Sequence, residues 1–335
     1  MNKYLVPQRT SVETIIPVLS EEYGLVSPEV SYPLDTSIND VYIINSGRRL
    51  YGFKVYTFFS EKTPDNLKYE ESTIKEFGVL GIKLPLFVLT KRNEIYCKVG
   101  RYLGALFNFV EGDSFEDEEE YYKSAGGLLG RIHSIPATII EGISYVPTLN
   151  DFNLLFGESL TLDELLDIHK TILMRTEFES MKYVLTKINN LTMSSSNKLK
   201  TFVHGEYDKK ALRFHERRVS GLLDFESSRI DNPFFDLACA YRNFGCINRN
   251  ISSPDLGRFN IFIEEYKREF PTANEIHNDF PFYMKIFLGQ LIISRLYYSL
   301  KTGDFISFKN QEQKLIREIA WVEENSKFLT DLIKR

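Results

Sequence analysis

A chain of 335 residues, of which 43% are hydrophobic and 26% charged, has the composition of a folded globular protein and not of a disordered one. The net charge of −5 provides no basic footprint for nucleic acid, and the three cysteines match neither a zinc-binding nor a disulfide pattern. Because residues 1–16 lack the apolar core of a signal peptide and the longest apolar stretch, around residues 286–293, is too short to span a bilayer, we expect a cytoplasmic protein without a membrane or nucleic-acid partner.

The first third of the chain alternates between helical and strand patterns. Apolar residues recur at helical spacing over residues 9–23, where Ser11 is placed to cap a helix. Two β-rich runs within residues 41–59 flank a turn at 46–48, and a helix is predicted over residues 66–80. Further short strands are predicted over residues 84–89, 95–99 and 107–110.

The pattern becomes mainly helical after residue 113. An acidic run at 116–120 is predicted to be the first turn of a helix capped by Ser114, because carboxylates interact favourably with the dipole at a helix N-terminus. Two short β runs, at 200–203 and 219–223, flank a polar loop. Helical patterns cover residues 121–135, 162–192 and most of 255–333.

This change of pattern near Gly112 divides the chain into two predicted lobes. We predict an α+β bilobal fold, with a small mixed β lobe over residues 1–112 and a larger, mainly helical lobe over residues 113–335. Bilobal proteins commonly bind their ligands in the cleft between the lobes.

Carboxylates gather around one loop in the second predicted lobe. His204 and Glu206 open the loop, and Asp224 ends the following β run twenty positions after His204. Asp231 and Asp236 follow within a dozen residues. Carboxylates at strand ends that face one loop can hold a hard cation such as Mg²⁺, which prefers oxygen ligands and bridges phosphates.

Three short motifs follow one another in this segment: HGE at 204–206, LLDFE at 222–226 and DNPFFDLA at 231–238. They resemble the HGD-x4-N motif, the hydrophobic strand ending in DF and the D-P-x-x-D-[LI]-A motif of the aminoglycoside phosphotransferase and choline kinase family. Their order and spacing are also those of the family. Each motif alone would be a weak signal, but the three together are specific.

Segments upstream of these motifs also match the family. YGFKVY at 51–56 resembles the strand that carries the phosphate-contacting lysine, and the helix that begins at residue 69 resembles the family's E-x6-L-x7-P helix. LFNFVEG at 106–112 resembles the hinge between lobes, and LLGRIH at 128–133 resembles the L-L-G-x-L-H helix. The resemblance therefore extends from about residue 30 to residue 245.

This resemblance implies a protein-kinase-like fold that binds ATP with Mg²⁺, and it implies a role for each matching residue. Lys54 would contact the phosphates and pair with Glu70, with Glu71 as the alternative partner. The metal ligand would be Asp224, and the position of the catalytic acid is held by Glu206. The other implied nucleotide contacts are Ser37 and Asn39 in the loop over the phosphates and the backbone of Asn108 and Val110 at the adenine.

Two positions of the loop depart from the family pattern. Glu206 stands where the family has an aspartate, and its side chain is one methylene longer but can still accept a proton. Ala211 stands where the family has an asparagine metal ligand, and alanine has no ligating atom. Asp208 or Glu226 can supply the missing oxygen ligand, and Asp208 is also the second candidate for the catalytic base.

Other residues of the segment have structural interpretations. His204 and Asp236 are predicted to hold the loop, and His133 is predicted to be a packed helix residue. The aromatic residues that follow are predicted to lie mainly in the core: Phe234, Phe235, Tyr241 and Phe244. One or two of them are alternatively expected to line an acceptor pocket, where aromatic faces would suit an amine.

These residues lead to two hypotheses about function. The first is ATP-dependent phosphotransfer to a hydroxyl group of a small molecule, such as an amino alcohol, an amino sugar or a homoserine-like compound. The second is a catalytically silent kinase-like protein that binds nucleotide or another ligand as a structural or regulatory partner. Glu206 and Ala211 favour the silent protein, whereas Lys54, Glu70 and Asp224 favour the enzyme.

Overall fold

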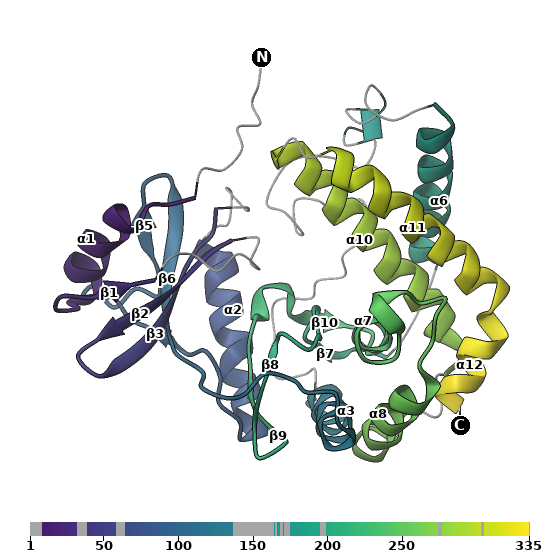
Figure 1. The fold of residues 1–335 in the computed structure, drawn as a ribbon, viewed down its shortest axis with the longest axis horizontal. Helices are drawn as coiled ribbons and strands as arrows, with labels where there is room; N and C mark the ends of the chain where they lie inside the picture. Colours follow the sequence, from purple (N-terminus) through teal and green to yellow (C-terminus); the bar gives the residue numbers. More distant parts are fainter. Residues whose placement is uncertain are drawn as a thin grey trace. The chain divides into compact units, whose positions relative to one another are not determined.

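The computed structural model describes residues 9–31, 39–57, 64–136, 164, 166–167, 170, 175–194, 199–273, 277–302 and 305–334. Within these ranges the chain forms two compact units, the first ending at Glu111 and the second beginning at Gly112. The first unit is built around a β-sheet, and the second is mainly helical (Figure 1). The chain therefore has the predicted α+β fold, with a small sheet lobe and a larger helical lobe.

The sheet of the first unit has six antiparallel strands in the order β1-β2-β3-β6-β4, and β5 pairs with β6 beside this path. The strands are β1 (Glu29–Val30), β2 (Asp40–Ser46), β3 (Arg49–Val55), β4 (Phe87–Val88), β5 (Cys97–Val99) and β6 (Tyr102–Asn108). The helices are α1 (Val12–Tyr23) and α2 (Pro64–Glu76), and α2 continues as the 3-10 helix η1 (Phe77–Leu80). The predicted turn at 46–48 is confirmed, since Ser46 pairs with Arg49 across a two-residue turn.

Helices α1 and α2 cover opposite faces of this sheet. Side chains alternate between the faces along β6, so Leu106 points away from Ala105. Leu106 packs in one buried cluster with Ile15 of α1. Ala105 packs in a second cluster with Leu67 of α2. Lys54 lies directly opposite Ala105 in the β3–β6 register, so its side chain projects from the face that α2 covers.

The predicted strand over residues 107–110 is wrong in its extent. Strand β6 begins at Tyr102 and ends at Asn108. Gly104 lies near the start of β6, and glycine is depleted in strands because it has no side chain to pack. The β pattern of this strand is therefore interrupted in the sequence.

The second unit contains two small antiparallel sheets among its helices. Strand β7 (Thr201–Val203) pairs with β10 (Arg229–Asp231), and β8 (Leu212–His215) pairs with β9 (Arg218–Leu222). The helices are α3 (Glu119–His133), α6 (Arg175–Ser194), α7 (Phe234–Phe244), α8 (Leu256–Glu269), α10 (Phe280–Thr302), α11 (Phe305–Glu324) and α12 (Ser326–Lys334), with the 3-10 turns η3 (Phe225–Ser227), η4 (Ile247–Arg249) and η5 (His277–Asp279). None of the helices in the described ranges combines the length and the apolar character that a membrane span requires.

Helix α3 begins later than the acidic run predicts. Its first residue is Glu119, so Ser114 does not cap it. Glu119 and Glu120 lie in the first turn, where carboxylates are favourable. Asp117 lies before the helix and accepts a hydrogen bond from the Tyr122 hydroxyl at 2.7 Å. Strands β8 and β10 are also absent from the sequence-based prediction, because these short runs are interrupted by charged or polar residues, unlike β7.

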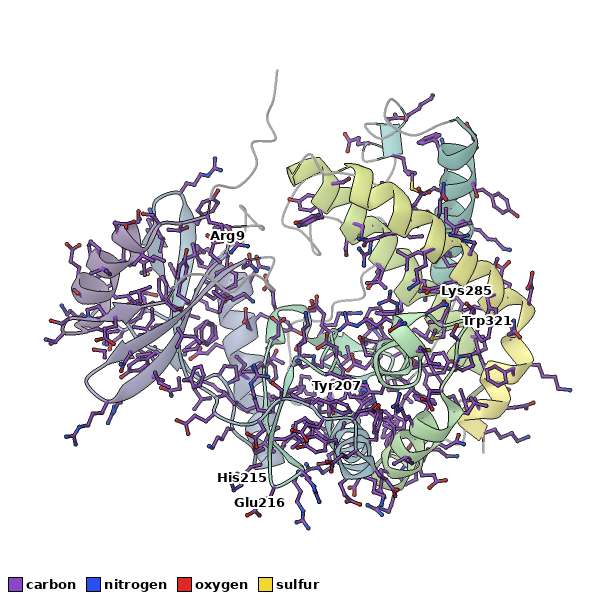
Figure 2. The ribbon with its side chains drawn as sticks, viewed as in Figure 1. Arg9, Tyr207, His215, Glu216, Lys285 and Trp321 are labelled. Carbon is purple, nitrogen blue, oxygen red and sulfur yellow. The ribbon has the colours of Figure 1, made fainter. Side chains whose placement is uncertain are left out.

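The loop between β7 and β8 is anchored in the core of the second unit. Tyr207 is fully buried, whereas His215 and Glu216 at the tip of the β8–β9 hairpin are exposed (Figure 2). The Tyr207 hydroxyl donates a hydrogen bond to the carbonyl of Ala125 in α3 at 2.7 Å. This contact fixes the middle of the loop to a long helix.

Helices α3 and α8 pack with their backbones in contact. A β-carbon on Gly126 would lie 2.1 Å from the carbonyl oxygen of Phe262 in α8. On the same helix, a β-carbon on Gly127 would meet only Glu269 Cγ, at 3.9 Å. The close approach therefore depends on glycine at residue 126 and not at its neighbour.

We predict that Gly126→Ala lowers the free energy of unfolding by about 2 kcal/mol or more, because overpacking against a backbone atom forces the helices apart. The matched change Gly127→Ala is expected to be neutral or to stabilise by up to about 1 kcal/mol, since alanine has the higher helix propensity. Urea denaturation followed by circular dichroism measures both variants. Equal effects of the two changes would contradict the close packing of α3 on α8.

Candidate active site

Lys54, Tyr56 and Glu70 converge on the α2-covered face of the first sheet. The Lys54 ammonium lies 5.3 Å from the centroid of the Tyr56 ring. The Tyr56 hydroxyl donates a hydrogen bond to Glu70 Oε2 at 3.3 Å, and Glu70 is buried. Glu71 instead forms an ion pair with Lys75 at 2.7 Å, one turn along α2. These contacts favour Glu70 over Glu71 as the partner of Lys54, which stays a prediction.

The other predicted nucleotide contacts fall in different environments. Asn39 is buried just before β2, and Ser37 lies outside the described residues. Asn108 ends β6, and its amide donates to the carbonyl of Leu86 at 2.9 Å. Val110 is buried, and within the described part of the chain no backbone hydrogen bond involves its amide. This amide can therefore donate to a ligand, as the predicted adenine contact requires.

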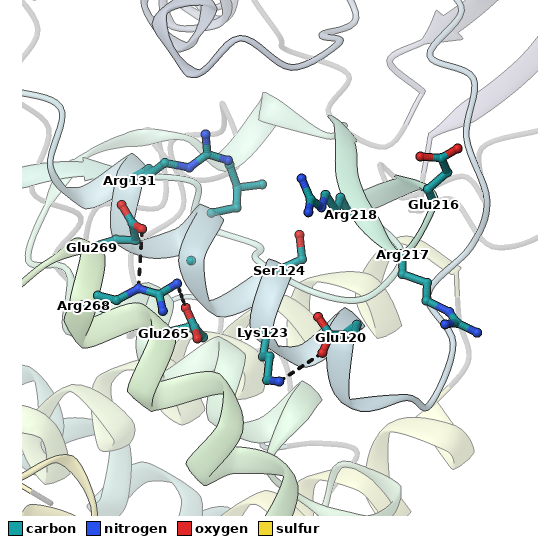
Figure 3. A pocket seen from close by; sticks show the side chains of 12 residues that line it. Glu120, Lys123, Ser124, Arg131, Glu216, Arg217, Arg218, Glu265, Arg268 and Glu269 are labelled. Carbon is teal, nitrogen blue, oxygen red and sulfur yellow. Dashed lines mark hydrogen bonds and ion pairs between the residues drawn. The ribbon is translucent and has the colours of Figure 1, made fainter.

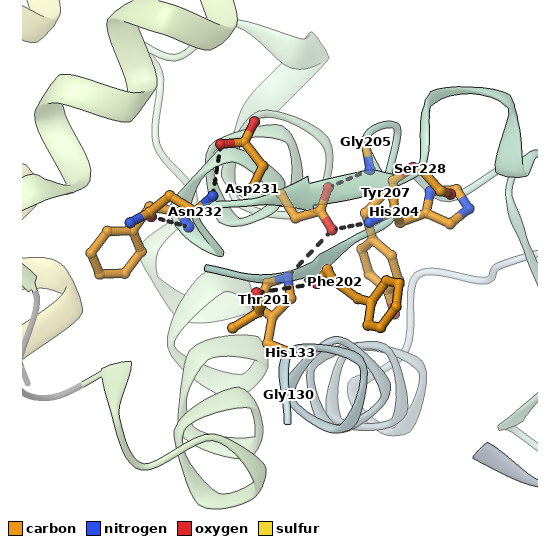
Figure 4. A network of polar contacts seen from close by, with 12 residues as sticks. Gly130, His133, Thr201, Phe202, His204, Gly205, Tyr207, Ser228, Asp231 and Asn232 are labelled. Carbon is orange, nitrogen blue, oxygen red and sulfur yellow. Dashed lines mark hydrogen bonds and ion pairs between the residues drawn. The ribbon is translucent and has the colours of Figure 1, made fainter. Parts of the chain in front are cut away.

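One buried carboxylate, that of Asp236 in the first turn of α7, holds the loop that follows β7. Its Oδ2 accepts a hydrogen bond from the His204 amide at 2.6 Å, and its Oδ1 accepts one from the Gly205 amide at 2.7 Å. His133 Nε2 of α3 lies 3.3 Å from Oδ2 (Figure 4). His133 Nδ1 lies 2.9 Å from the Tyr266 hydroxyl of α8. The predicted role of Asp236 as a brace of the loop is confirmed, and His133 takes part in the same network.

The donors around Asp236 keep its carboxyl group ionised. Burial by itself raises the pKa of this group, but the His133 hydrogen bond and the charge and amide of His204 outweigh burial and lower the pKa below its usual value. Hydrogen bonds from backbone amides to an ionised carboxylate are stronger than those to a neutral acceptor. Asp236 therefore holds the loop through its charge as well as its shape.

His204 and Gly205 connect the loop to the segment that carries Asp224. His204 Nε2 donates to the carbonyl of Leu223 at 2.8 Å, which confirms a structural role for this imidazole. Gly205 has a φ of 87°, and a β-carbon on it would lie 2.2 Å from the carbonyl oxygen of Ser227. Both the left-handed backbone and the close approach of Ser227 require glycine at this position.

This connection brings together the segments of the predicted base and the predicted metal ligands. Glu206 is exposed, and its Oε1 accepts a hydrogen bond from the Ser227 hydroxyl at 2.9 Å. Asp224 immediately precedes the turn η3 that contains Ser227, and its side chain is exposed. Asp224 has left-handed backbone angles, with φ 64° and ψ 63°. Glu226 lies in the same turn and is half-buried.

Asp224 and Glu226 are the carboxylates of this segment that could hold a magnesium ion together with bound phosphates. Mg²⁺ usually keeps several waters and binds proteins through one or two carboxylates together with substrate phosphates. In the part of the chain that the structure describes, no group of three or more His, Cys, Asp or Glu side chains is arranged to hold a metal ion. The two carboxylates would therefore serve as metal ligands only together with the oxygens of a bound nucleotide.

Asp208 is engaged by the loop itself. Its Oδ1 accepts hydrogen bonds from the amides of Lys210 and Ala211 at 2.8 and 3.0 Å, and its Oδ2 lies 3.5 Å from the Arg249 guanidinium. An aspartate that accepts from the amide two residues further along forms a turn by its own side chain. Asp208 thus shapes the loop, and the assignment of Glu206 as the base stays a prediction.

Lys209 makes cation–π contacts with three aromatic rings beside the loop. Its ammonium lies 4.6 Å from the ring centroid of Phe115, 5.3 Å from that of Tyr122 and 5.7 Å from that of Phe244. Burial lowers the pKa of Lys209, while the aromatic faces stabilise its charge. Of the aromatic residues considered for an acceptor pocket, Phe244 therefore contacts a lysine of the chain itself. The other three are buried in the core: Phe234, Phe235 and Tyr241.

A polar groove of about 520 Å³ lies elsewhere in the second unit, between α3, the β8–β9 turn and α8 (Figure 3). Its lining carries both signs of charge in neighbouring pairs, such as Lys123 with Glu120 at 3.0 Å and Arg268 with Glu265. None of the predicted site residues belongs to the residues that line it. The groove is therefore separate from the site that the motifs predict.

Sequence patterns alone do not single out the basic residues that flank the loop. Arg242 on α7, Arg249 in η4 and Arg295 on α10 lie near one another, together with Glu318 on α11. A signal is nevertheless present, because Arg242 and Arg295 each interrupt an otherwise largely apolar helical run. Charged residues are seldom buried in such runs unless they have a partner.

Solved structures with a similar fold include small-molecule kinases. An amicoumacin kinase in complex with AMP-PNP and Ca²⁺ has a TM-score of 0.67 at 12% identity, covering 96% of this chain and 93% of that chain. A microcompartment-associated aminopropanol kinase has a TM-score of 0.63 at 14% identity, covering 96% and 99%. A spectinomycin phosphotransferase in complex with ADP has a TM-score of 0.60 at 13% identity, covering 97% and 100%. At these identities the likeness shows the fold alone.

Sequence comparison identifies the family. No curated protein sequence gives a significant match to the chain. The family model described as "Phosphotransferase enzyme family" matches residues 34–255, a range that contains the predicted site residues and all three motifs of the loop segment. The chain therefore belongs to this phosphotransferase family, with the protein-kinase-like fold that its motifs predict.

Proposed function

We propose that the chain is an ATP-dependent phosphotransferase that uses Mg²⁺ and phosphorylates a hydroxyl group of a small molecule. The observation that carries this proposal is the hydrogen bond from Ser227 to Glu206, because Ser227 lies in the turn that Asp224 begins. A base and a metal ligand on touching segments are what phosphoryl transfer to a hydroxyl requires. Membership of the phosphotransferase family supports the same class of reaction.

In this proposal Glu206 accepts the proton of the acceptor hydroxyl while the hydroxyl oxygen bonds to the γ-phosphorus of ATP and ADP leaves. Bound Mg²⁺, held by Asp224 and Glu226, would neutralise charge on the phosphates. Asp236 keeps the loop in place, and this matters because a displacement of about 1 Å can cost about 10²-fold in rate.

The first unit would supply the contacts to the nucleotide. Lys54 would bind the phosphates, and the backbone of Asn108 and Val110 would bind the adenine. The AMP-PNP and ADP bound in solved kinases of the same fold support a nucleotide as the phosphate donor. Residues 1–112 would then form the nucleotide-binding lobe, and residues 113–335 would carry the catalytic loop and the acceptor site.

A catalytically silent kinase-like protein is the second candidate, and Ala211 favours it. Ala211 has no oxygen in its side chain, and Asp208, which could replace the missing ligand, already accepts hydrogen bonds from two loop amides. A silent protein would bind Mg²⁺-ATP without transferring its phosphate to any acceptor. A nucleotide-consumption screen with amino alcohols, amino sugars and homoserine-like compounds separates the two candidates.

We predict that Asp224→Asn abolishes most of the stabilisation that Mg²⁺-ATP gives the parent protein, because the change removes the charge that faces the metal but preserves size. Thermal-shift titration with and without Mg²⁺ measures this effect. Asp65→Asn, which removes an equally charged but 89% exposed carboxylate on α2, serves as the control and should behave like the parent. If Asp224→Asn binds Mg²⁺-ATP as tightly as the parent, Asp224 is not a metal ligand.

We predict that Glu206→Gln lowers kcat by at least about 10²-fold with any acceptor that supports turnover, because the amide cannot accept the hydroxyl proton. The Kd for Mg²⁺-ATP should barely change, since Glu206 faces the acceptor in this proposal. Glu216→Gln at the exposed hairpin tip removes the same charge and should leave kcat unchanged. Undiminished turnover by Glu206→Gln would exclude Glu206 as the base and make Asp208 the next residue to test.

A further inference from the structure

Basic side chains from separate elements of the second unit gather near the catalytic loop. Arg242 lies near the end of α7, Arg249 ends η4, and Arg295 lies on α10. We call these three residues the arginine cluster. Glu318 of α11 lies among them, and Lys314 lies one turn before Glu318.

Arg242 is buried but poorly paired. It is 8% exposed, and its Nε has no hydrogen-bond partner among the described residues. The nearest carboxylate oxygen that pairs with it, Glu318 Oε2, lies 3.9 Å away, which is too far for a hydrogen bond. Lys314 Nζ lies 3.8 Å from Glu318 Oε1. Charge-assisted hydrogen bonds have N–O distances of about 2.7–2.9 Å, so neither Arg242 nor Lys314 is hydrogen-bonded to Glu318.

Arg295 adds a second guanidinium with an unsatisfied donor. Its Nε is buried and has no hydrogen-bond partner in the part of the chain that the structure describes. Burial lowers the pKa of Arg295, and repulsion by Arg242 lowers it further. Two neighbouring guanidinium groups that share one carboxylate leave positive charge uncompensated, which is costly away from water.

The charges around the arginine cluster do not balance. Arg249 is exposed, and its guanidinium lies 3.5 Å from Asp208 of the loop. In the ion pairs that these four basic residues form within the described ranges, the carboxylates are those of Glu318 and Asp208. This excess of positive charge would be compensated by a bound anion.

Helix α7 connects the arginine cluster to the catalytic loop. Asp236 and Arg242 are six residues apart, so they lie about 9 Å apart along the helix. Cys239 lies between them. Burial raises the pKa of its thiol most, the carboxylates of Asp208 and Glu206 raise this pKa further, and Arg242 lowers it. Arg249 of the cluster lies 3.5 Å from Asp208, two residues after the proposed base Glu206, so the cluster adjoins the catalytic loop.

We propose that the arginine cluster binds an anionic group, a carboxylate or a phosphate, of the acceptor whose hydroxyl is phosphorylated. This inference rests on the proposed function, since it takes Glu206 to mark the position of the hydroxyl. Guanidinium groups bind carboxylate and phosphate through paired N–H donors, and the unsatisfied Nε atoms of Arg242 and Arg295 are such donors. Among the acceptor classes considered above, the cluster favours a homoserine-like hydroxy acid over an amino alcohol or an uncharged or cationic sugar.

The test measures thermal stabilisation of the full chain, without nucleotide, by inorganic phosphate and by glycerate at constant ionic strength. The parent is compared with Arg295→Gln and with Arg317→Gln, which removes the same charge from an exposed position of α11. At least one anion should raise the Tm of the parent and of Arg317→Gln in a saturable manner. Arg295→Gln should weaken the apparent affinity about 10-fold or more, as expected for the loss of a charge-assisted hydrogen bond. A response to glycerate indicates a carboxylate acceptor, and a response to phosphate indicates a phosphorylated one.

Without added anion, Arg295→Gln should leave the Tm unchanged or raise it, because it relieves repulsion in the cluster. If the parent responds to neither anion, or if Arg295→Gln and Arg317→Gln respond equally, the proposal is overturned. Should Arg295→Gln fail to fold, Arg249→Gln replaces it with the same expectation for anion affinity, since that side chain is exposed. Because no nucleotide is present, failure of this test is distinguishable from failure of Mg²⁺-ATP binding.

Discussion

The two hydrogen bonds from backbone amides to the Asp236 carboxylate support the rest of the catalytic loop. They fix the peptide planes of His204 and Gly205, and two further contacts of the loop start from these residues. The His204 imidazole donates a hydrogen bond to the Leu223 carbonyl, and the backbone of Gly205 packs closely against Ser227. Both contacts therefore depend on the position of the loop. A neutral side chain at residue 236 would leave a buried donor poorly satisfied, and such losses are expensive.

The loop is also held from its far side. Asp208 closes the turn by accepting from two amides, and Lys209 is inserted among three aromatic rings. Residues 207–210 contain neither proline nor glycine, so side-chain contacts hold this turn in place of backbone restriction. Glu206 lies between two anchored stretches, which is the arrangement that a catalytic group at this position would need.

The features that the sequence predicts correctly depend on residues that are close together in the chain. The fold class, the hairpin between β2 and β3 and the brace by Asp236 all follow from local spacing or from motifs. Strand β6 is predicted poorly because Gly104 interrupts its pattern. The arginine cluster is not predicted at all, since its members lie on three separate elements and meet only through the packing of α7, η4 and α10. The predicted contacts of Glu206, Asp224 and the nucleotide residues await the experiments described above.

The left-handed backbone at Asp224 limits which residues can occupy this position without strain. Among residues other than glycine, aspartate and asparagine adopt that conformation with the least strain, and longer side chains do so less readily. Asparagine and glycine would preserve the backbone but lose the charge, whereas glutamate would preserve the charge against the preference of the backbone. Aspartate alone meets both demands. No such restriction applies to residue 206, whose φ is not positive, so the backbone there accepts glutamate as readily as aspartate.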